Sequence, residues 1–380
     1  EAEIQLYSHA APLGESLRTN ESSQVRVDLV SQTIDAFRVK VVEKTPGTEN
    51  GQAFQEVRHY LTVTFPPMSY HQLHTTMPYP AMPEPVTSFG AAVLNNSAYY
   101  YGGHTGNAHE YSDDGQGKTL FRLELKPGSE WESLEKGPGL QGLALVALNG
   151  KLYRMGGFTA KNKAGEDHDL WSQDDFAAYD PKTNRWEDLP ALPEPRSSFD
   201  AAVLDGKIYI VGGWMLAGAG EESWHQTAWR IDPANIEAGW EQLPTPPFQK
   251  RALSVAAFDG KLYAIGGMTS EGQPTREVSI YSPQTQQWER GPALLGHGMT
   301  GFGTSAFAQA GALYVSAFDG TLQRLSAEET KWELIGQFEN ARFFHRMLPV
   351  GDQQLLILGG SNMSVGIFDE PELLDLSKQN

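Results

Sequence analysis

The chain contains no cysteine among its 380 residues. This absence excludes disulfide bonds, thiolate metal sites and cysteine nucleophiles together. Long apolar runs are also missing, since no stretch reaches the roughly 18 apolar residues that a membrane-spanning helix needs. The first residues, "EAEIQLYSHA", have neither a methionine nor a basic and apolar leader, so we expect a processed or trimmed N-terminus.

Basic residues are scarce, with 29 Lys and Arg against 47 Asp and Glu and a net charge of −18. So acidic a chain repels phosphate backbones and acidic lipid surfaces, and we expect no nucleic-acid partner. The sequence also lacks GxSxG, HExxH and phosphate-loop motifs. Glu166, Asp167 and Asp169 follow no ordered calcium-loop spacing, so we interpret them as a solvated loop. No metal site and no cofactor is expected.

Glycine is plentiful, with 39 residues, and much of it recurs at a regular spacing. Four segments are nearly alike: "AAVLNNSAYYYGGH" (91–104), "LVALNGKLYRMGGF" (145–158), "AAVLDGKIYIVGGW" (201–214) and "VAAFDGKLYAIGGM" (255–268). Weaker copies follow at 306–319, where Ala317 and Phe318 replace the glycines, and at 350–361. A period of about 50 residues indicates a propeller or an array.

Each copy has the features of paired strands. Asn-Gly or Asp-Gly at 149–150, 205–206 and 259–260 is a strong signal for a tight hairpin. A third strand follows each hairpin, and a fourth opens with tryptophan, at Trp131, Trp186, Trp240, Trp288 and Trp332. Four antiparallel strands in each period predict one blade of a β-propeller. We expect the tryptophans to pack each blade against the next.

The glycine pair, the tyrosine shortly before it and the spaced tryptophan resemble the kelch repeat over about residues 84–376. The resemblance implies an all-β fold, a β-propeller of four-stranded kelch-like blades with six clear repeats, in a domain over 84–380. The sixth repeat lacks its tryptophan strand because the chain ends. Residues 70–76 resemble that missing strand, and we expect them to close the ring.

Residues 1–83 are expected to form a β-rich N-terminal segment that includes this closing strand. Alternating runs at 24–30, 36–42 and 57–65 predict strands. They fit either a degenerate seventh blade, with residues 4–8 as its closing strand, or a β extension beside a six-bladed ring. We favour seven blades.

The antiparallel pairing of the first two strands predicts where a site lies. Residues just before the inner strand and just after the glycine pair share one face of the propeller. Three long loops, 104–118, 158–174 and 214–226, stand on that face, and we expect a lopsided bowl with a basic inner ring. The predicted ligand-binding residues are Arg196, Arg251, His297, Arg342, His104, Trp214 and Trp224, with Trp171, His168 and His225 above them.

Each of these residues also has a structural interpretation. An arginine before an inner strand can bond the neighbouring blade's carbonyls or a carboxylate. The histidines can be satisfied loop residues, and Trp224 can anchor its loop.

Because kelch proteins very often bind a protein or peptide, the resemblance implies a non-catalytic binding module. The arginines favour an acidic or carbohydrate-containing partner, either a protein or a glycan. The alternative is a sugar mutarotase or epimerase resembling the bacterial sialic acid mutarotases in architecture. Its candidate acid and base are Glu222 and His225, with Arg196 or Arg251 holding a sugar carboxylate.

Galactose oxidase also has a kelch-like propeller, but its chemistry needs a cysteine linked to a tyrosine, which this chain cannot supply. A third interpretation is an architectural fragment of a larger exported protein. We expect a monomer that is secreted or periplasmic and of bacterial origin.

Overall fold

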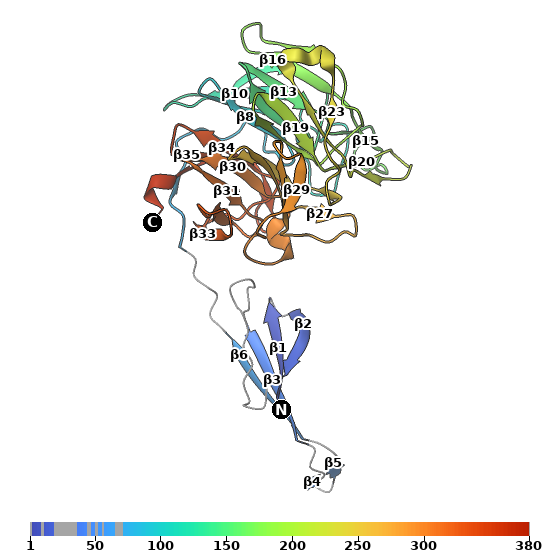
Figure 1. The fold of residues 1–380 in the computed structure, drawn as a ribbon, viewed down its shortest axis with the longest axis vertical. Coiled ribbons are helices and arrows are strands. Elements are labelled where there is room, and N and C mark those ends of the chain that lie inside the picture. The colour runs from blue at the N-terminus through green and yellow to red at the C-terminus, as the bar shows by residue number, and fades with distance from the viewer. Residues whose placement is uncertain are drawn as a thin grey trace. The chain divides into compact units, whose positions relative to one another are not determined.

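A computed structural model describes residues 71–379 and, before them, the strand segments 2–8, 11–18, 36–43, 47–49, 52–54 and 57–64 (Figure 1). The chain divides into two compact units. One takes in Glu1–Tyr70 and Leu295–His297, and the other takes in His71–Leu294 and Gly298–Asn380.

The N-terminal unit contains a four-stranded antiparallel sheet with the order β2-β1-β3-β6. Its strands are β1 (Ala2–Ser8), β2 (Ala11–Arg18), β3 (Ala36–Glu43) and β6 (Val57–Thr64), and a small hairpin pairs β4 (Gly47–Glu49) with β5 (Gln52–Phe54). The strands expected at 36–42 and 57–65 are therefore confirmed. The run at 24–30 lies outside the described residues.

Within residues 71–379, six four-stranded antiparallel sheets form the blades of a propeller. Blade 1 is β8 (Gly90–Leu94), β9 (Ser97–Tyr101), β10 (Thr119–Glu124) and β11 (Glu132–Lys136). Blade 2 is β12 (Ala144–Leu148), β13 (Lys151–Met155), β16 (Phe176–Asp180) and β17 (Arg185–Asp188). Blade 3 is β18 (Asp200–Leu204), β19 (Lys207–Val211), β22 (Ala228–Ile231) and β23 (Glu241–Gln242).

The remaining three blades follow the same order. Blade 4 is β25 (Ser254–Phe258), β26 (Lys261–Ile265), β28 (Val278–Ser282) and β29 (Gln287–Arg290). Blade 5 is β30 (Ser305–Gln309), β31 (Ala312–Ser316), β32 (Thr321–Leu325) and β33 (Trp332–Gln337). Blade 6 is β34 (Arg346–Val350), β35 (Gln354–Leu358), β38 (Glu372–Asp375) and β7 (Thr75–Thr76).

Blade 6 is completed from the far end of the sequence. Thr75 and Thr76 of β7 pair with Leu374 and Leu373 of β38, which confirms the predicted closing strand. Leu73 beside them is 4% exposed and joins the apolar cluster that contains Leu374. A closing strand of this kind removes the free sheet edge that an open ring would leave.

The ring closes with six blades, so the expected seventh blade is wrong. Gly360 in blade 6 donates its N–H directly to the carbonyl of Val86, at the start of blade 1. The N-terminal strands form their own sheet instead, with β1 paired to β2 and β3. Alternating polarity correctly indicates a strand, but it does not specify which strand will be its neighbour.

A circle of backbone hydrogen bonds surrounds the axis on one face. Each blade contributes one residue with left-handed φ, shortly before its inner strand: Ser88, Gly142, Ser198, Ala252, Gly303 and Phe344. The N–H of each donates to the carbonyl of the corresponding residue in the preceding blade, over 2.7 to 3.2 Å, and Ser88 completes the circle by donating to Phe344. We call this the backbone ring. Because only two of its members are glycines, the left-handed conformation has little signal in the sequence.

The glycine pairs allow neighbouring blades to approach closely. Gly212 has φ of 77°, and a Cβ there would lie 2.8 Å from the Lys250 carbonyl oxygen of the next blade. The N–H of Gly213, whose φ is 92°, donates to that carbonyl at 2.7 Å. The Asp-Gly turn before it has φ of 50° and 73°, the left-handed pair of a two-residue hairpin. The predicted hairpin is therefore confirmed.

The tryptophans of the fourth strands link blades, as predicted. Four of them donate their indole N–H to a proline carbonyl of the preceding blade: Trp131 to Pro80 at 3.1 Å, Trp240 to Pro190 at 3.4 Å, Trp288 to Pro244 at 2.8 Å and Trp332 to Pro292 at 2.8 Å. Trp186 differs, because its buried indole nitrogen has no partner within the described residues. The Arg154 guanidinium lies 4.5 Å from its ring instead.

This difference gives a test of the blade-linking bond. We expect Trp288→Phe to lower the free energy of unfolding by about 1 kcal/mol more than Trp186→Phe, because only the first substitution removes a hydrogen bond. Both keep an aromatic ring in place. Urea unfolding of the two variants measures the difference, and equal losses would show that the Pro244 bond adds nothing to stability.

Helical structure within the described residues is limited to three 3-10 turns, η1 (Pro233–Ala238), η2 (Gly298–Gly301) and η3 (Leu376–Lys378). In this part of the chain, no helix has the length and apolar character that crossing a membrane requires.

Candidate functional site

Residues before the inner strands and after the glycine pairs lie side by side, as the antiparallel geometry predicts. Ser197 bridges to Trp214. In the next blade, β24 (Lys250–Arg251) pairs with β27 (Met268–Thr269). We call this side of the propeller, which also carries the backbone ring, the loop face.

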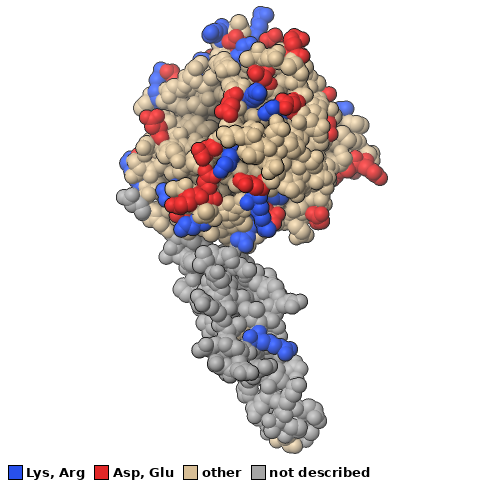
Figure 2. All heavy atoms as spheres, viewed as in Figure 1, with Lys and Arg blue, Asp and Glu red and all other residues tan. Residues whose placement is uncertain are grey.

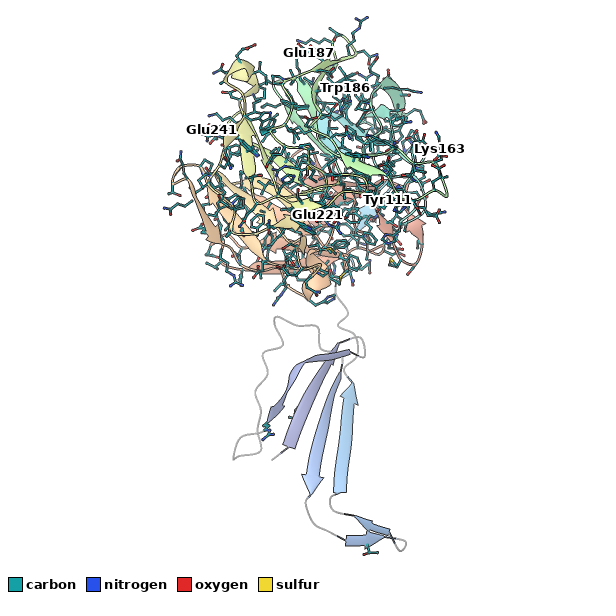
Figure 3. The ribbon with its side chains drawn as sticks, turned by 90° about the vertical axis from the view of Figure 1, so that its right-hand side faces the viewer. Tyr111, Lys163, Trp186, Glu187, Glu221 and Glu241 are labelled. Carbon is teal, nitrogen blue, oxygen red and sulfur yellow. The ribbon has the colours of Figure 1, made fainter. Side chains whose placement is uncertain are left out.

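Long loops pack together on the loop face. They include the hairpin of β14 (Phe158–Ala160) with β15 (Leu170–Ser172) and that of β20 (Trp214–Met215) with β21 (Ser223–Trp224). The Tyr111 ring lies 5.0 Å from His104, 5.6 Å from Phe158 and 5.4 Å from His168. In Figure 3, Tyr111 and Lys163 lie on the same side of the propeller, and Glu241 lies on the opposite side. The loops therefore form one wall.

Arg196 is fully buried and hydrogen-bonded within its own blade. Its guanidinium donates to the carbonyls of Gly212 at 2.7 Å and Thr227 at 3.0 Å, and it pairs with Glu194 at 2.9 Å. Burial lowers the pKa of Arg196 to about 10, and Glu194 acts against that shift. This geometry favours the structural interpretation of Arg196, so we leave it out of the proposed site.

Arg342 is placed in the same way. It is 4% exposed, forms an ion pair with the buried Glu372 and donates to the Gly359 carbonyl at 3.2 Å. Its guanidinium also lies 4.1 Å from the Phe368 ring. Burial lowers the pKa of Arg342, and Glu372 opposes this shift. The geometry again favours a structural role.

Two of the predicted histidines are buried, and the third belongs to the other compact unit. His225 is 7% exposed, with Nε2 2.9 Å from the Pro195 carbonyl oxygen. Burial first and Arg196 second lower the pKa of His225 to about 4, so the ring is neutral at pH 7. His104 is 5% exposed, and its Nε2 lies 2.7 Å from the carbonyl oxygen of Asn107. His297 belongs to the segment Leu295–His297 of the other compact unit.

Arg251 is the one predicted arginine with an open position. It is half-buried, and its guanidinium carbon lies 4.2 Å from the Trp214 ring and 5.6 Å from the Trp224 ring. Nη2 contacts the Met268 sulfur at 3.3 Å, while the buried Nε has no hydrogen-bond partner within the described residues. Burial lowers the pKa of Arg251, and the charges of Tyr111 and Glu222 oppose this shift.

Four phenylalanines of blades 5 and 6 gather on the loop face. Phe302, Phe318, Phe343 and Phe344 are all partly exposed, with ring centroids 5.1 to 6.3 Å apart. We call this group the phenylalanine shelf. The bond from the Gly303 N–H to the Ala252 carbonyl joins the backbone beside Phe302 to the backbone beside Arg251. The blade that carries the arginine and the blade that carries Phe302 are thus bonded directly to each other.

Several buried polar atoms on the loop face have no partner within the described residues. They are His104 Nδ1, both side-chain polar atoms of Gln141, Trp214 Nε1, Arg196 Nε and Arg251 Nε. Buried polar groups are nearly always satisfied by protein or ordered water, and exceptions need an explanation. Ser129 Oγ, Arg154 Nη1, Trp186 Nε1 and both ring nitrogens of His345 are likewise unpartnered within the described residues, so these atoms do not by themselves mark a site.

The acidic loop after β14 is engaged internally. Trp171 is 37% exposed, its indole donates to Asp169, and the Lys161 ammonium lies 4.5 Å from its ring. Glu166 accepts the N–H of Lys163 at 2.8 Å. Among the described residues, no three His, Asp or Glu side chains are arranged to hold a metal ion.

Sequence reasoning overlooked the phenylalanine shelf, although two signals were available. Phe318 stands where a glycine stands in the other blades, and Phe343 and Phe344 follow Arg342 directly. Sequence reasoning also treated Arg196 and Arg251 as equivalent. Their positions in the repeat differ by one residue, because Arg196 stands five residues before Ala201, where its inner-strand repeat begins, and Arg251 stands four before Val255.

Comparison with known proteins supports the fold. Two family profiles, both described as Kelch motif, match residues 139–193 and residues 195–247 and 251–295. Mouse Kelch-like protein 35 is 26% identical over 219 residues, which are 57% of this chain and 33% of that protein. Beta-scruin of Limulus polyphemus is 27% identical over 202 residues, 53% of this chain and 21% of that protein. The aligned part is thus about a third or less of each of these relatives.

A solved structure, that of YjhT, aligns with a TM-score of 0.64 and 17% identity over 80% of this chain and 98% of that one. At this identity the likeness shows the fold alone. Together with the matched motifs, the six blades, the glycine pairs and the blade-linking tryptophans show that residues 139–295 carry kelch motifs within a six-bladed propeller.

Proposed function

We propose that the protein is a non-catalytic binding module whose loop face recognises an acidic group on a protein segment. The observation that carries the proposal is Arg251, whose guanidinium packs against Trp214 and Trp224 without an ion-pair partner among the described residues. Kelch propellers generally mediate protein interactions, which fits this use of the face.

The environment of Arg251 suits a carboxylate. A half-buried charge without a partner is unfavourable, and an incoming carboxylate relieves it through charge-assisted hydrogen bonds. The two indoles hold the guanidinium in one place, so little side-chain entropy is lost on binding. On the side of the molecule that Figure 2 shows, acidic and basic side chains are interspersed.

The phenylalanine shelf favours one class of partner. This partner is a protein segment that carries an apolar side chain beside its acidic one. Aromatic and apolar contacts around one buried charge are typical of the energetic centre of an interface. Met363 and Val365, which are 87% and 67% exposed, extend the apolar surface through the hairpin of β36 (Ser361–Asn362) and β37 (Gly366–Ile367). The backbone of Phe343 bridges to Ser361 of that hairpin.

The mutarotase alternative has less support from the geometry. His225 is buried, neutral and held by the Pro195 carbonyl, so it is poorly placed to exchange protons with a sugar. Glu222 is exposed. Burial lowers the pKa of Arg251 and the charge of Glu222 opposes this shift, but the two side chains share no hydrogen bond or ion pair within the described residues. An acidic sugar could still use Arg251 and the indoles, and the binding experiment below includes that outcome.

Arg251→Met is expected to abolish a preference for acidic peptides. The assay uses an array of eight-residue peptides, each with one Glu flanked by Leu or Phe, and a matched array with Gln. We expect the protein to bind the best Glu peptides at least about tenfold more tightly than their Gln counterparts, because a hydrogen-bonded charge contributes roughly 1.5–3 kcal/mol.

The matched control is Arg290→Met, which removes an arginine that is 79% exposed and pairs with Glu277 on the outer strand. It should keep the preference for Glu. Unchanged discrimination in Arg251→Met would refute the site. Binding of sialic acid or glucuronate, with no response to any peptide, would replace the protein segment by an acidic glycan.

A further inference from the structure

The six inner strands enclose a cavity of about 310 Å³ along the axis. Its walls come from short apolar stretches of every blade: 91–93, 145–147, 201–203, 255–257, 306–308 and 347–349. The wall residues near the hairpin turns, such as Val93, Ala147, Val203 and Ala257, are less buried than those at the start of each strand. The cavity therefore opens on the turn side, opposite the loop face.

Arg346 closes the other end. Its Nε donates to the Phe89 carbonyl at 2.9 Å, Nη1 pairs with Asp200 at 2.9 Å, and Nη2 donates to the Leu143 carbonyl at 3.4 Å. The other oxygen of Asp200 accepts the N–H of Val255 at 2.8 Å. One ion pair thus joins five blades across the axis.

A second, smaller cavity of about 50 Å³ lies between this pair and the backbone ring, and Arg346 lines both. His345 also lines it. Burial first, then Arg342 and Arg346, lower the pKa of His345 to about 3, so the ring is neutral. The large cavity is therefore blind, with an ion pair as its floor and an uncharged histidine behind it.

The hydrogen-bonding groups of Arg346 and Asp200, at the closed end of the cavity, determine which ligands fit. Three of the five guanidinium N–H groups of Arg346 have acceptors in the chain, which leaves donors for a guest. Asp200 balances the charge of Arg346 and keeps lone pairs that can accept. The floor is therefore neutral overall and offers both donors and acceptors at the end of an apolar tube.

We propose that this cavity binds an uncharged amphipathic molecule, with a hydroxyl or primary amide end on Arg346 and Asp200 and a slim apolar body along the inner strands. A cavity of roughly 150 Å³ lined by apolar side chains holds benzene, so this one has room for about twice that bulk. It falls at the small end of ligand pockets.

Charged guests are disfavoured by the same residues. A carboxylate would meet Asp200, and an ammonium would meet Arg346, each at the closed end of a low-dielectric tube. The site is independent of Arg251, since it lies on the other side of the ion pair and uses none of the loop-face residues.

The test compares 1-hexanol and hexanamide with hexanoate and hexylamine as probes, by saturation-transfer NMR and thermal shift on the full chain. The neutral probes should bind at least about tenfold more tightly than the charged ones. Ala257→Phe places a ring in the half-buried wall and should weaken neutral-probe binding at least tenfold. Ser364→Phe, an exposed position on the loop face, is the matched control and should leave it unchanged.

A second variant tests the ion pair at the closed end while keeping its positive charge. Arg346→Lys keeps the charge opposite Asp200 but loses the planar set of donors, so the affinity for hexanamide should fall while the protein still folds. Equal binding of neutral and charged probes, equal binding by Ala257→Phe and the control, or no binding of any probe overturns the proposal.

Discussion

Replacing Arg196 by methionine is expected to cost about 3–5 kcal/mol of the free energy of unfolding, because it leaves buried polar groups without their partner. Arg196 is fully buried and bonds the carbonyls of Gly212 and Thr227 and the carboxylate of Glu194. Thr227 also donates its hydroxyl to Glu194 at 2.6 Å, so the loss reaches a connected network. Urea unfolding with intrinsic fluorescence measures the change.

Arg251→Met is the matched control for this prediction. Arg251 precedes the next inner strand and carries the same charge, but it is half-buried and has no ion-pair partner among the described residues. Its replacement should cost about 1 kcal/mol or less, since only the packing on the two indoles and the contact with the Met268 sulfur are lost. If the two substitutions destabilise equally, the assignment of one arginine to the fold and the other to binding is wrong.

Removing the closing strand should be the most damaging change to the propeller. A chain that begins at residue 71 keeps β7 and should unfold cooperatively as a monomer. A chain that begins at residue 79 loses β7 and the buried Leu73, whose burial alone contributes roughly 1.5–3 kcal/mol. It also leaves β38 as an unpaired edge, which favours aggregation.

Size-exclusion chromatography and a thermal melt of the two chains distinguish these expectations. The longer chain should elute as one species with a single transition. The shorter chain should aggregate or melt at a clearly lower temperature. Matching profiles would mean that blade 6 is stable with three strands and that Thr75 and Thr76 do not hold the ring together.

Much of the propeller could be predicted from the sequence because each repeat contains residues whose preferences act locally. Asp-Gly specifies a hairpin turn, a glycine pair specifies close approach, and tryptophan at the start of the fourth strand marks a contact between blades. Those rules say nothing about how many blades a ring needs. The number six follows from long-range contacts, such as Gly360 with Val86, which no local pattern records.

The site was harder to predict because a shift of one position changes the role of an arginine. Arg196, Lys250 and Arg342 stand two residues before Ser198, Ala252 and Phe344 of the backbone ring, and all three are buried. Arg251 stands one residue before and faces outward. Since neighbouring side chains of an extended segment point to opposite sides, counting from the ring separates the two roles. The ring itself became visible only in the structure.

The backbone ring also has an electrostatic consequence. Its six N–H to carbonyl bonds all run in the same sense around the axis, so their peptide dipoles circulate head to tail. Dipoles arranged in a closed circle cancel, unlike the aligned dipoles of a helix, which add along one direction. The ring therefore gives the centre of the loop face rigidity without a field of its own. The potential there is left to individual side chains, and Arg251 is one of them.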